Sequence, residues 1–162
     1  EVLHNNCLFF NYLINTSRIH WRKEFEEVWQ PHEAEERKAY IEANKFNIAG
    51  PKLNGAEIEE QKLHLINKIY AYGYLLHRYK DSNRPWYVFA MDNKPSEEGE
   101  SHGGTGKSIA FKSLSYFMNT VNLDGRNRRL TDNPFIYERV TEHTDYILID
   151  DADQYLNFSF FF

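Results

Sequence analysis

Two short stretches hold the residue types that bind phosphate and divalent cations. The first is "GESHGGTGKS", residues 99–108, in which a run of glycines leads to Lys107 and Ser108. Glycines let a loop curl so that successive backbone N–H groups face an anion. The second is "YILIDDAD", residues 146–153, an apolar run that ends in Asp150 and Asp151. Carboxylates at the end of a strand can hold magnesium beside a bound nucleotide. Together the two stretches predict a magnesium–nucleotide site.

Each residue has a role in this predicted site. Lys107 would neutralise the β- and γ-phosphates, and the Ser108 hydroxyl would ligate magnesium together with Asp150. Asp151 would orient or deprotonate the attacking water. The predicted catalytic residues are therefore Lys107 and Asp151, and the predicted metal ligands are Ser108 and Asp150. The residues predicted to contact the phosphates, mainly through backbone N–H groups, are His102, Gly103, Gly104, Thr105, Gly106, Lys107 and Ser108.

Each motif also has a plainer interpretation. Ser101 stands where the usual phosphate-loop pattern has its first glycine, so the loop could be a glycine-rich surface loop. The pair Asp150 and Asp151 could belong to a solvated acidic turn after a strand. Asp153 fits a helix N-cap or a surface charge better than a third metal ligand. The flanking elements favour the phosphate loop, because such a loop needs a strand before it and a helix that starts at the lysine.

The elements around the loop follow an alternating pattern. Residues 86–91, "WYVFAM", predict a buried parallel strand, and the helix is predicted from Lys107 onward. Residues 120–125 predict a second strand, residues 133–142 a short helix, and residues 146–150 a further buried strand. Strands that alternate with helices are typical of a parallel α/β sheet.

The first half of the chain reads as a helical region. Its first fifteen residues fit a strand or a short helix, because periodicity cannot decide at that length. A helix capped by Thr16 or Ser17 is predicted next, then one that starts at Pro31, then a long one over residues 54–80. The apolar side of the long helix is predicted to consist of Ile58, Leu65, Ile66, Ile69 and Leu76. We therefore expect a mostly helical region at 1–82 and an ATPase-like core at 83–162.

Composition excludes several classes of protein. The chain has 162 residues, a formal net charge of -5 and a single cysteine, Cys7, so an internal disulfide or a cysteine-cluster metal site is ruled out. This cysteine usage fits a reducing compartment, and we expect a cytoplasmic protein. No apolar run approaches the roughly 20 residues that span a bilayer, so no membrane partner is expected. The first residue, Glu1, and the final "NFSFFF" suggest a piece of a longer protein.

The two motifs resemble those of the superfamily 3 helicases, particularly the poxvirus-type helicase-primases of phages and mobile elements. Residues 103–108, "GGTGKS", are similar to the end of that family's A motif, and residues 147–151 to its B motif. The resemblance covers about residues 84–157. It implies an α/β fold in which a helical N-terminal region precedes a partial, AAA+-like P-loop NTPase core that is truncated at its C-terminus. The family's polar sensor and arginine finger are expected beyond Phe162.

The resemblance also implies a function. We expect a P-loop ATPase that binds ATP and Mg²⁺, acts on single-stranded DNA in phage or mobile-element replication, and forms a homo-oligomeric ring in the cytoplasm of a bacterial or phage-infected cell. Residues 124–129, "DGRNRR", could contact single-stranded nucleic acid or a neighbour's nucleotide, or could form a solvated loop. Two other functions stay open: a small-molecule kinase that uses the same loop, and a helical docking fragment whose loop is catalytically silent.

Overall fold

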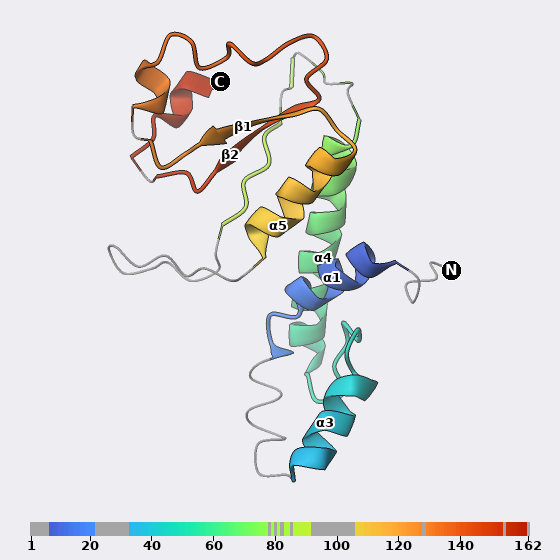
Figure 1. Cartoon of the computed structure of the whole chain (residues 1–162). Helices are drawn as coiled ribbons and strands as arrows, with labels where there is room; N and C mark the ends of the chain where they lie inside the picture. Colours follow the sequence, from blue (N-terminus) through green and yellow to red (C-terminus); the bar gives the residue numbers. More distant parts are fainter. Residues whose placement is uncertain are drawn as a thin grey trace. The chain divides into compact units, whose positions relative to one another are not determined.

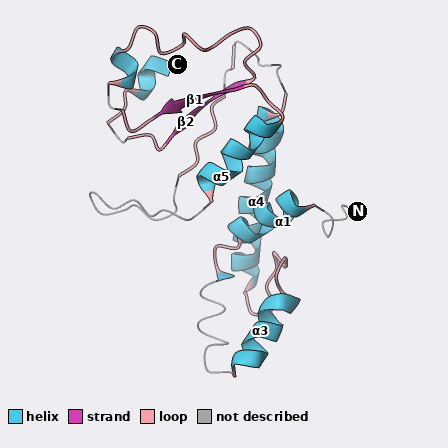
Figure 2. Cartoon of the chain, viewed as in Figure 1, coloured by secondary structure: helices cyan, strands magenta, loops and turns pink. Residues whose placement is uncertain are grey.

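The structure, a computed structural model, describes residues 7–21, 33–77, 79, 81, 83–84, 86–91, 106–127, 129–153 and 155–161. The chain divides into two units, residues 1–77 and 78–162, and each is described by itself. The first unit is helical and the second holds a small sheet, so the chain is a mixed α/β protein (Figure 1, Figure 2). Within the described residues, no helix is both long enough and apolar enough to cross a membrane.

Three helices make up the described part of the first unit: α1 (Leu8–Ser17), α3 (Ala34–Ala43) and α4 (Gly55–Leu75). A capping box fixes the start of α4. The Asn54 side chain accepts from the Glu57 backbone N–H, and the Glu57 carboxylate accepts from the Asn54 N–H, both at 3.0 Å. The helices predicted after Pro31 and over 54–80 are confirmed, with shorter bounds.

The beginning of the chain differs from the predicted order of elements. The open choice for the first fifteen residues resolves to a helix, α1, which continues through Thr16 and Ser17. The prediction that Thr16 or Ser17 caps a following helix is therefore wrong. The Thr16 hydroxyl instead donates to the Tyr12 carbonyl one turn back, at 3.0 Å. The rest of the predicted second helix, residues 22–30, lies outside the described residues.

Helix α1 packs against α4 through contacts of mixed character. The rings of Phe9 and Tyr72 meet edge to face at 5.3 Å between centroids. Further along the pair, the Lys68 ammonium donates to the Thr16 carbonyl at 2.6 Å. The side chain of Gln61 is 1% exposed, yet it accepts from the His20 N–H and donates to a loop carbonyl. Polar groups therefore share the interface with aromatic ones.

This packing corrects the predicted apolar side of α4. Ile66, Ile69 and Leu76 were expected to be buried, but they are 56%, 42% and 52% exposed. The fully buried residues of the helix are Gln61 and Tyr72. The reason is that Gln61 is buried by the segments that follow α1 and α3, where its side chain finds hydrogen-bond partners. Hydrophobic periodicity cannot register such partners.

The second unit contains α5 (Lys107–Lys112), β1 (Thr120–Asp124) and β2 (Tyr146–Asp150). A 3₁₀ turn over Ser113–Tyr116 extends α5. Figure 2 draws α5 in cyan and the two strands in magenta. The two strands pair in parallel, from Thr120 opposite Tyr146 to Asp124 opposite Asp150. The helix predicted from Lys107, the strands predicted at 120–125 and 146–150, and their parallel pairing are confirmed.

Alternation along the strands assigns the two faces of this sheet. Leu123 and Ile149 pack against a buried cluster of Leu130, Ile136 and Leu156. Residues at even positions of β2 point to the opposite face, on which α5 lies. There the Tyr146 hydroxyl donates to the Phe111 carbonyl at 2.6 Å. Asp150 shares this parity with Tyr146, so its carboxylate points toward α5.

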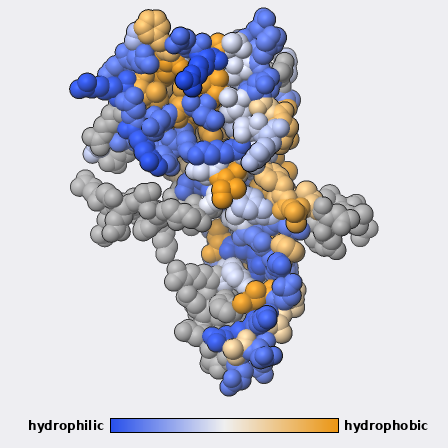
Figure 3. All heavy atoms as spheres, viewed as in Figure 1, coloured by the Kyte–Doolittle hydropathy of each residue, from blue (hydrophilic) through white to orange (hydrophobic). Residues whose placement is uncertain are grey.

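Two predicted elements of this unit do not form. Residues 86–91 run without the ladder bonds of a strand, and Trp86 and Met91 are 68% and 82% exposed. Their aromatic side chains contact residues near the C-terminal end instead: Phe89 meets the ring of Phe158 at 5.9 Å. The prediction of a buried strand there is wrong. Figure 3 shows other apolar side chains exposed among hydrophilic ones.

The predicted helix at 133–142 is replaced by a series of turns. The Asn133 side chain accepts from the Phe135 N–H at 3.0 Å, which is an Asx turn. β-Turns of four residues then follow, in which Ile136, Glu138 and Val140 each donate to the carbonyl three positions back. The backbone from Asn133 to Val140 is therefore held by successive local turns in place of the predicted helix.

Candidate functional site

The two motifs meet where α5 starts and β2 ends. The Ser108 hydroxyl donates to Asp150 Oδ1 at 3.0 Å, across 42 positions of sequence. Ser108 lies in the first turn of α5, and Asp150 is the last residue of β2. Helix α5 and strand β2 are in contact, and the even-position parity of Asp150 directs it toward the helix. The structure therefore brings together the two residues predicted to ligate a metal.

Asp150 has a second partner on the same helix. Lys112 lies four residues after Ser108, on the same side of α5, and its ammonium forms an ion pair with Asp150 Oδ2. Lys112 holds the pKa of Asp150 below its ordinary value. Burial acts in the opposite direction with a smaller effect, and the Ser108 hydrogen bond lowers the pKa by less again. Asp150 is therefore ionised at neutral pH and able to ligate a cation.

Asp151 points into a different environment. It follows β2 with a φ of 50°, in the left-handed region that few non-glycine residues adopt. Its carboxylate pairs with the guanidinium of Arg126, which lies in the turn after β1. This pairing raises the pKa of Arg126. Arg126 belongs to the arginine-rich loop for which a nucleic-acid contact was one prediction, and in this structure it contacts the second acid of its own chain.

Only the end of the glycine-rich loop falls within the described residues. Gly106 precedes α5 with a φ of 83°, a left-handed conformation that favours glycine, and its carbonyl accepts from the Ala110 N–H at 3.0 Å. Lys107 is the first residue of the helix, as predicted. The other predicted phosphate-contacting residues, His102, Gly103, Gly104 and Thr105, lie outside the described residues.

A close approach of two backbone segments fixes the ends of both strands. The Gly125 N–H donates to the Asp150 carbonyl at 2.8 Å, and the Gly125 carbonyl accepts from the Asp153 N–H at 3.0 Å. A Cβ on Gly125 would lie 2.6 Å from Ala152 Cα, which leaves no room for a side chain. The position of both acids therefore depends on a glycine in the turn after β1.

The separation of the two oxygens fits magnesium. With bonds of about 2.0–2.1 Å, neighbouring oxygens of an octahedral magnesium lie about 2.9 Å apart. Ser108 Oγ and Asp150 Oδ1 are 3.0 Å apart. No group of three or more His, Cys, Asp or Glu side chains suited to a metal occurs among the described residues. The chemistry suits a metal held by one or two protein ligands together with phosphates and water.

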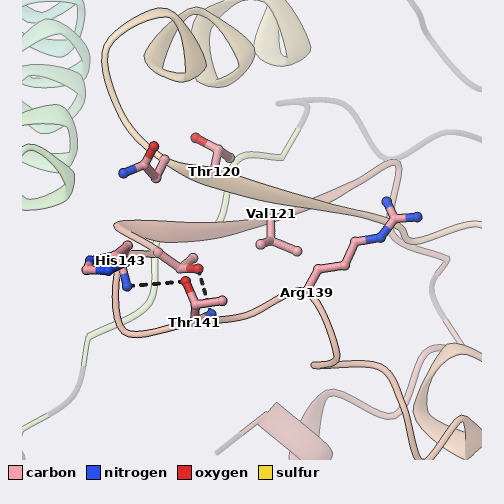
Figure 4. A pocket seen from close by; sticks show the side chains of 7 residues that line it. Thr120, Val121, Arg139, Thr141 and His143 are labelled. Atoms are coloured by element: carbon pink, nitrogen blue, oxygen red, sulfur yellow. Dashed lines mark hydrogen bonds between the residues drawn. The ribbon is translucent and has the colours of Figure 1, made fainter.

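A polar hollow of about 310 Å³ lies at the other end of the sheet, where the strands begin. It is lined by Asn119, Thr120, Val121, Arg139, Thr141, His143 and Thr144. Figure 4 shows the Arg139 side chain on one side of Val121 and the side chains of Thr141 and His143 on the other. Within the lining, the Thr141 hydroxyl accepts from the His143 N–H at 3.3 Å. This hollow is separate from the site at Asp150.

The motifs did not predict Lys112 and Arg126 as partners of the two acids. For Lys112 the signal was its spacing from Ser108. Residues four apart in a helix lie on the same side, so a helix that directs Ser108 at Asp150 also directs Lys112 there. For Arg126 the signal was the parallel pairing expected of the two predicted strands, at 120–125 and 146–150, because paired strands that end together bring the turns that follow them together. Comparison with protein-family models, curated proteins and solved structures finds no match to this chain.

Proposed function

We propose that this chain carries the magnesium–nucleotide site of a P-loop ATPase, the module that drives a DNA helicase or helicase-primase of the superfamily 3 type. The observation that supports it best is the 3.0 Å contact between Ser108 Oγ and Asp150 Oδ1. The packing of α5 on β2 brings the serine of one motif beside the acid of the other. A metal held by both residues needs these two oxygens side by side, and the contact meets that requirement.

Each residue of the site has a part in the proposed hydrolysis of ATP. Lys107 neutralises phosphate oxygens at the start of α5, and Ser108 and Asp150 hold the metal in place. Bound there, magnesium would offset the negative charge of the phosphates. Asp151 accepts a hydrogen bond from the attacking water and orients it toward the phosphate, once its carboxylate is free of Arg126.

The first experiment measures binding by thermal stability. A ligand that binds only the folded chain at 100 times its Kd stabilises it by about 2.7 kcal/mol. We expect Mg²⁺ with ATP to raise the melting temperature, and ATP with a chelator to raise it less. Lys107→Ala removes the phosphate contact and should abolish the rise. An equal melting temperature for the native chain with and without Mg²⁺ and ATP would exclude the site.

The second experiment tests the helicase assignment. Phosphate release is measured with single-stranded DNA, with duplex DNA, and with small hydroxylated acceptors. Stimulation by single-stranded DNA is expected, together with association into a ring in the presence of nucleotide. Phosphate transfer to a small acceptor would instead identify a kinase that uses the same loop.

A further inference from the structure

The carboxylate of Asp150 is engaged at both oxygens by one side of one helix. Ser108 donates to Oδ1, and Lys112 pairs with Oδ2. The Asp150 side chain is 23% exposed and that of Lys112 is 52% exposed. The lysine thus reaches inward from the surface to a largely covered acid. A fixed positive charge therefore lies beside the position proposed for the metal.

We infer that Lys112 is a positioning residue that competes with magnesium for Asp150 and so sets the magnesium concentration at which nucleotide binds. This inference rests on the proposed function. Without metal, the lysine compensates the acid's charge and keeps the carboxylate directed at Ser108. When a divalent cation binds at Asp150, it repels the Lys112 ammonium, because both positive charges then lie beside the same carboxylate. The lysine must then turn outward, which its exposed position allows.

Competition and simple structural support predict opposite results for the same substitution. If Lys112 competes with the metal, then Lys112→Gln removes the competitor and strengthens magnesium binding. If Lys112 only holds Asp150 in place, the same change loosens the carboxylate and weakens magnesium binding. The sign of the change in magnesium affinity therefore decides between them.

The experiment titrates Mg²⁺ at a fixed concentration of ADP and measures binding by calorimetry, so no turnover is needed. We expect Lys112→Gln to reach half-saturation at about five-fold less Mg²⁺, the effect of removing one partly exposed ion pair. Lys112→Arg keeps the charge and should behave like the native chain. Arg139→Gln is the matched control, because it removes one positive charge of the same unit at the opposite end of the sheet.

The outcomes separate this inference from the function on which it rests. If the native chain binds ADP with Mg²⁺ but Lys112→Gln needs the same or more Mg²⁺, the inference is wrong and the site stands. If Arg139→Gln lowers the requirement equally, a general charge effect replaces competition and the inference is again wrong. If the native chain shows no Mg²⁺-dependent ADP binding, the proposed function fails and takes the inference with it. Lys112→Met, checked for native circular dichroism, replaces Lys112→Gln if that variant does not fold.

Discussion

The Ser108 hydroxyl and Asp150 Oδ1 meet at 3.0 Å, which joins the first turn of α5 to the last residue of β2. Strand parity directs Asp150 toward the helix, and the start of α5 places Ser108 opposite it. Neither condition alone produces the contact. It requires the register of β2 and the start of α5 to agree, which makes it sensitive to single substitutions.

Removing the Ser108 hydroxyl tests its role as a metal ligand. We expect Ser108→Ala to weaken Mg²⁺-dependent ADP binding by at least about ten-fold, since a lost ligand should cost no less than a lost partner of a ligand. The free energy of unfolding should change by no more than about 1 kcal/mol, because Asp150 keeps its pair with Lys112. Calorimetry and urea unfolding measure the two effects. Ser108→Thr keeps the hydroxyl and should bind normally, and equal binding by Ser108→Ala would refute the ligand role.

A methyl group at Gly125 should destabilise the second unit. The added Cβ would meet the backbone of Ala152 at 2.6 Å, and backbone atoms cannot move aside as a flexible side chain can. Overpacking of this kind costs about 1–3 kcal/mol. Gly125→Ala should therefore lower the hydrogen-exchange protection of the amides in β1 and β2.

Gly73 provides the matched control for this substitution. It lies within α4, and a Cβ there would have nothing within 4 Å. Alanine is the better helix former, so Gly73→Ala should raise the stability of the first unit by up to about 1 kcal/mol. If Gly125→Ala leaves the stability of the second unit unchanged or raises it, as Gly73→Ala should do for the first unit, the close approach at Gly125 does not hold the ends of the two strands.

The pair of Arg126 and Asp151 leads to a prediction about turnover. The guanidinium is highly exposed, with 75% of its side chain accessible, so Arg126→Gln should leave the melting temperature unchanged. Its loss frees the Asp151 carboxylate to accept a hydrogen bond from water, and we expect severalfold faster basal phosphate release. Asp151→Asn should be inactive in both backgrounds. Slower release by Arg126→Gln would mean that the arginine supports Asp151 rather than restrains it.

The two paired strands could be predicted because the sequence around them carries local signals. Residues 146–150 are apolar up to Asp150, which a second acid follows, and residues 120–124 end at an aspartate that Gly125 follows. Residues 86–91 have an equally apolar sequence but form no ladder. A strand is stable only beside a partner, and the presence of a partner is a property of the fold rather than of the segment.

The polar side chains of the helical unit could not be predicted for a related reason. Periodicity of apolar residues assigns the buried side of a helix on the assumption that polar groups face water. In α4, Gln61 is buried because it bridges two other segments, through the His20 N–H and the Ile48 carbonyl. Contacts between distant segments decide its burial. The position of Lys112, by contrast, follows from helical spacing alone, because residues four apart lie on the same side of a helix.

The partly buried Lys68 of α4 gives the first unit a pH-dependent stability. Partial burial lowers the pKa of Lys68 from 10.5 to about 8, while its ammonium donates to Thr16. The lysine keeps its higher pKa in the unfolded chain. Between pH 8 and 10.5 the unfolded state therefore binds more protons than the folded state, so stability rises with pH in that range. Below pH 8 this contribution is lost.

The pKa values of neighbouring groups limit the pH range in which the effect of Lys68 can be measured. Burial and the charge of Lys68 lower the pKa of His64, which removes stability only on the acid side of pH 6.5. Burial raises the pKa of Tyr12, so its contribution is lost as pH rises above 10. Among the described groups of the first unit, urea unfolding between pH 7.5 and 9.5 therefore reports on Lys68. The expected slope is positive and at most about 1.4 kcal/mol per pH unit, the limit for one proton.

The variant Lys68→Met identifies the source of this slope. Methionine fills a similar volume without a titrating group, so the stability of the variant should lose the rise between pH 7.5 and 9.5. Its stability at pH 7 should be equal or higher, because no charge is then held in the interface between α1 and α4. Thr16→Val provides a second check, since it removes the hydroxyl partner and should lower the pKa of Lys68 further. A slope that persists in Lys68→Met would assign the pH dependence to another group.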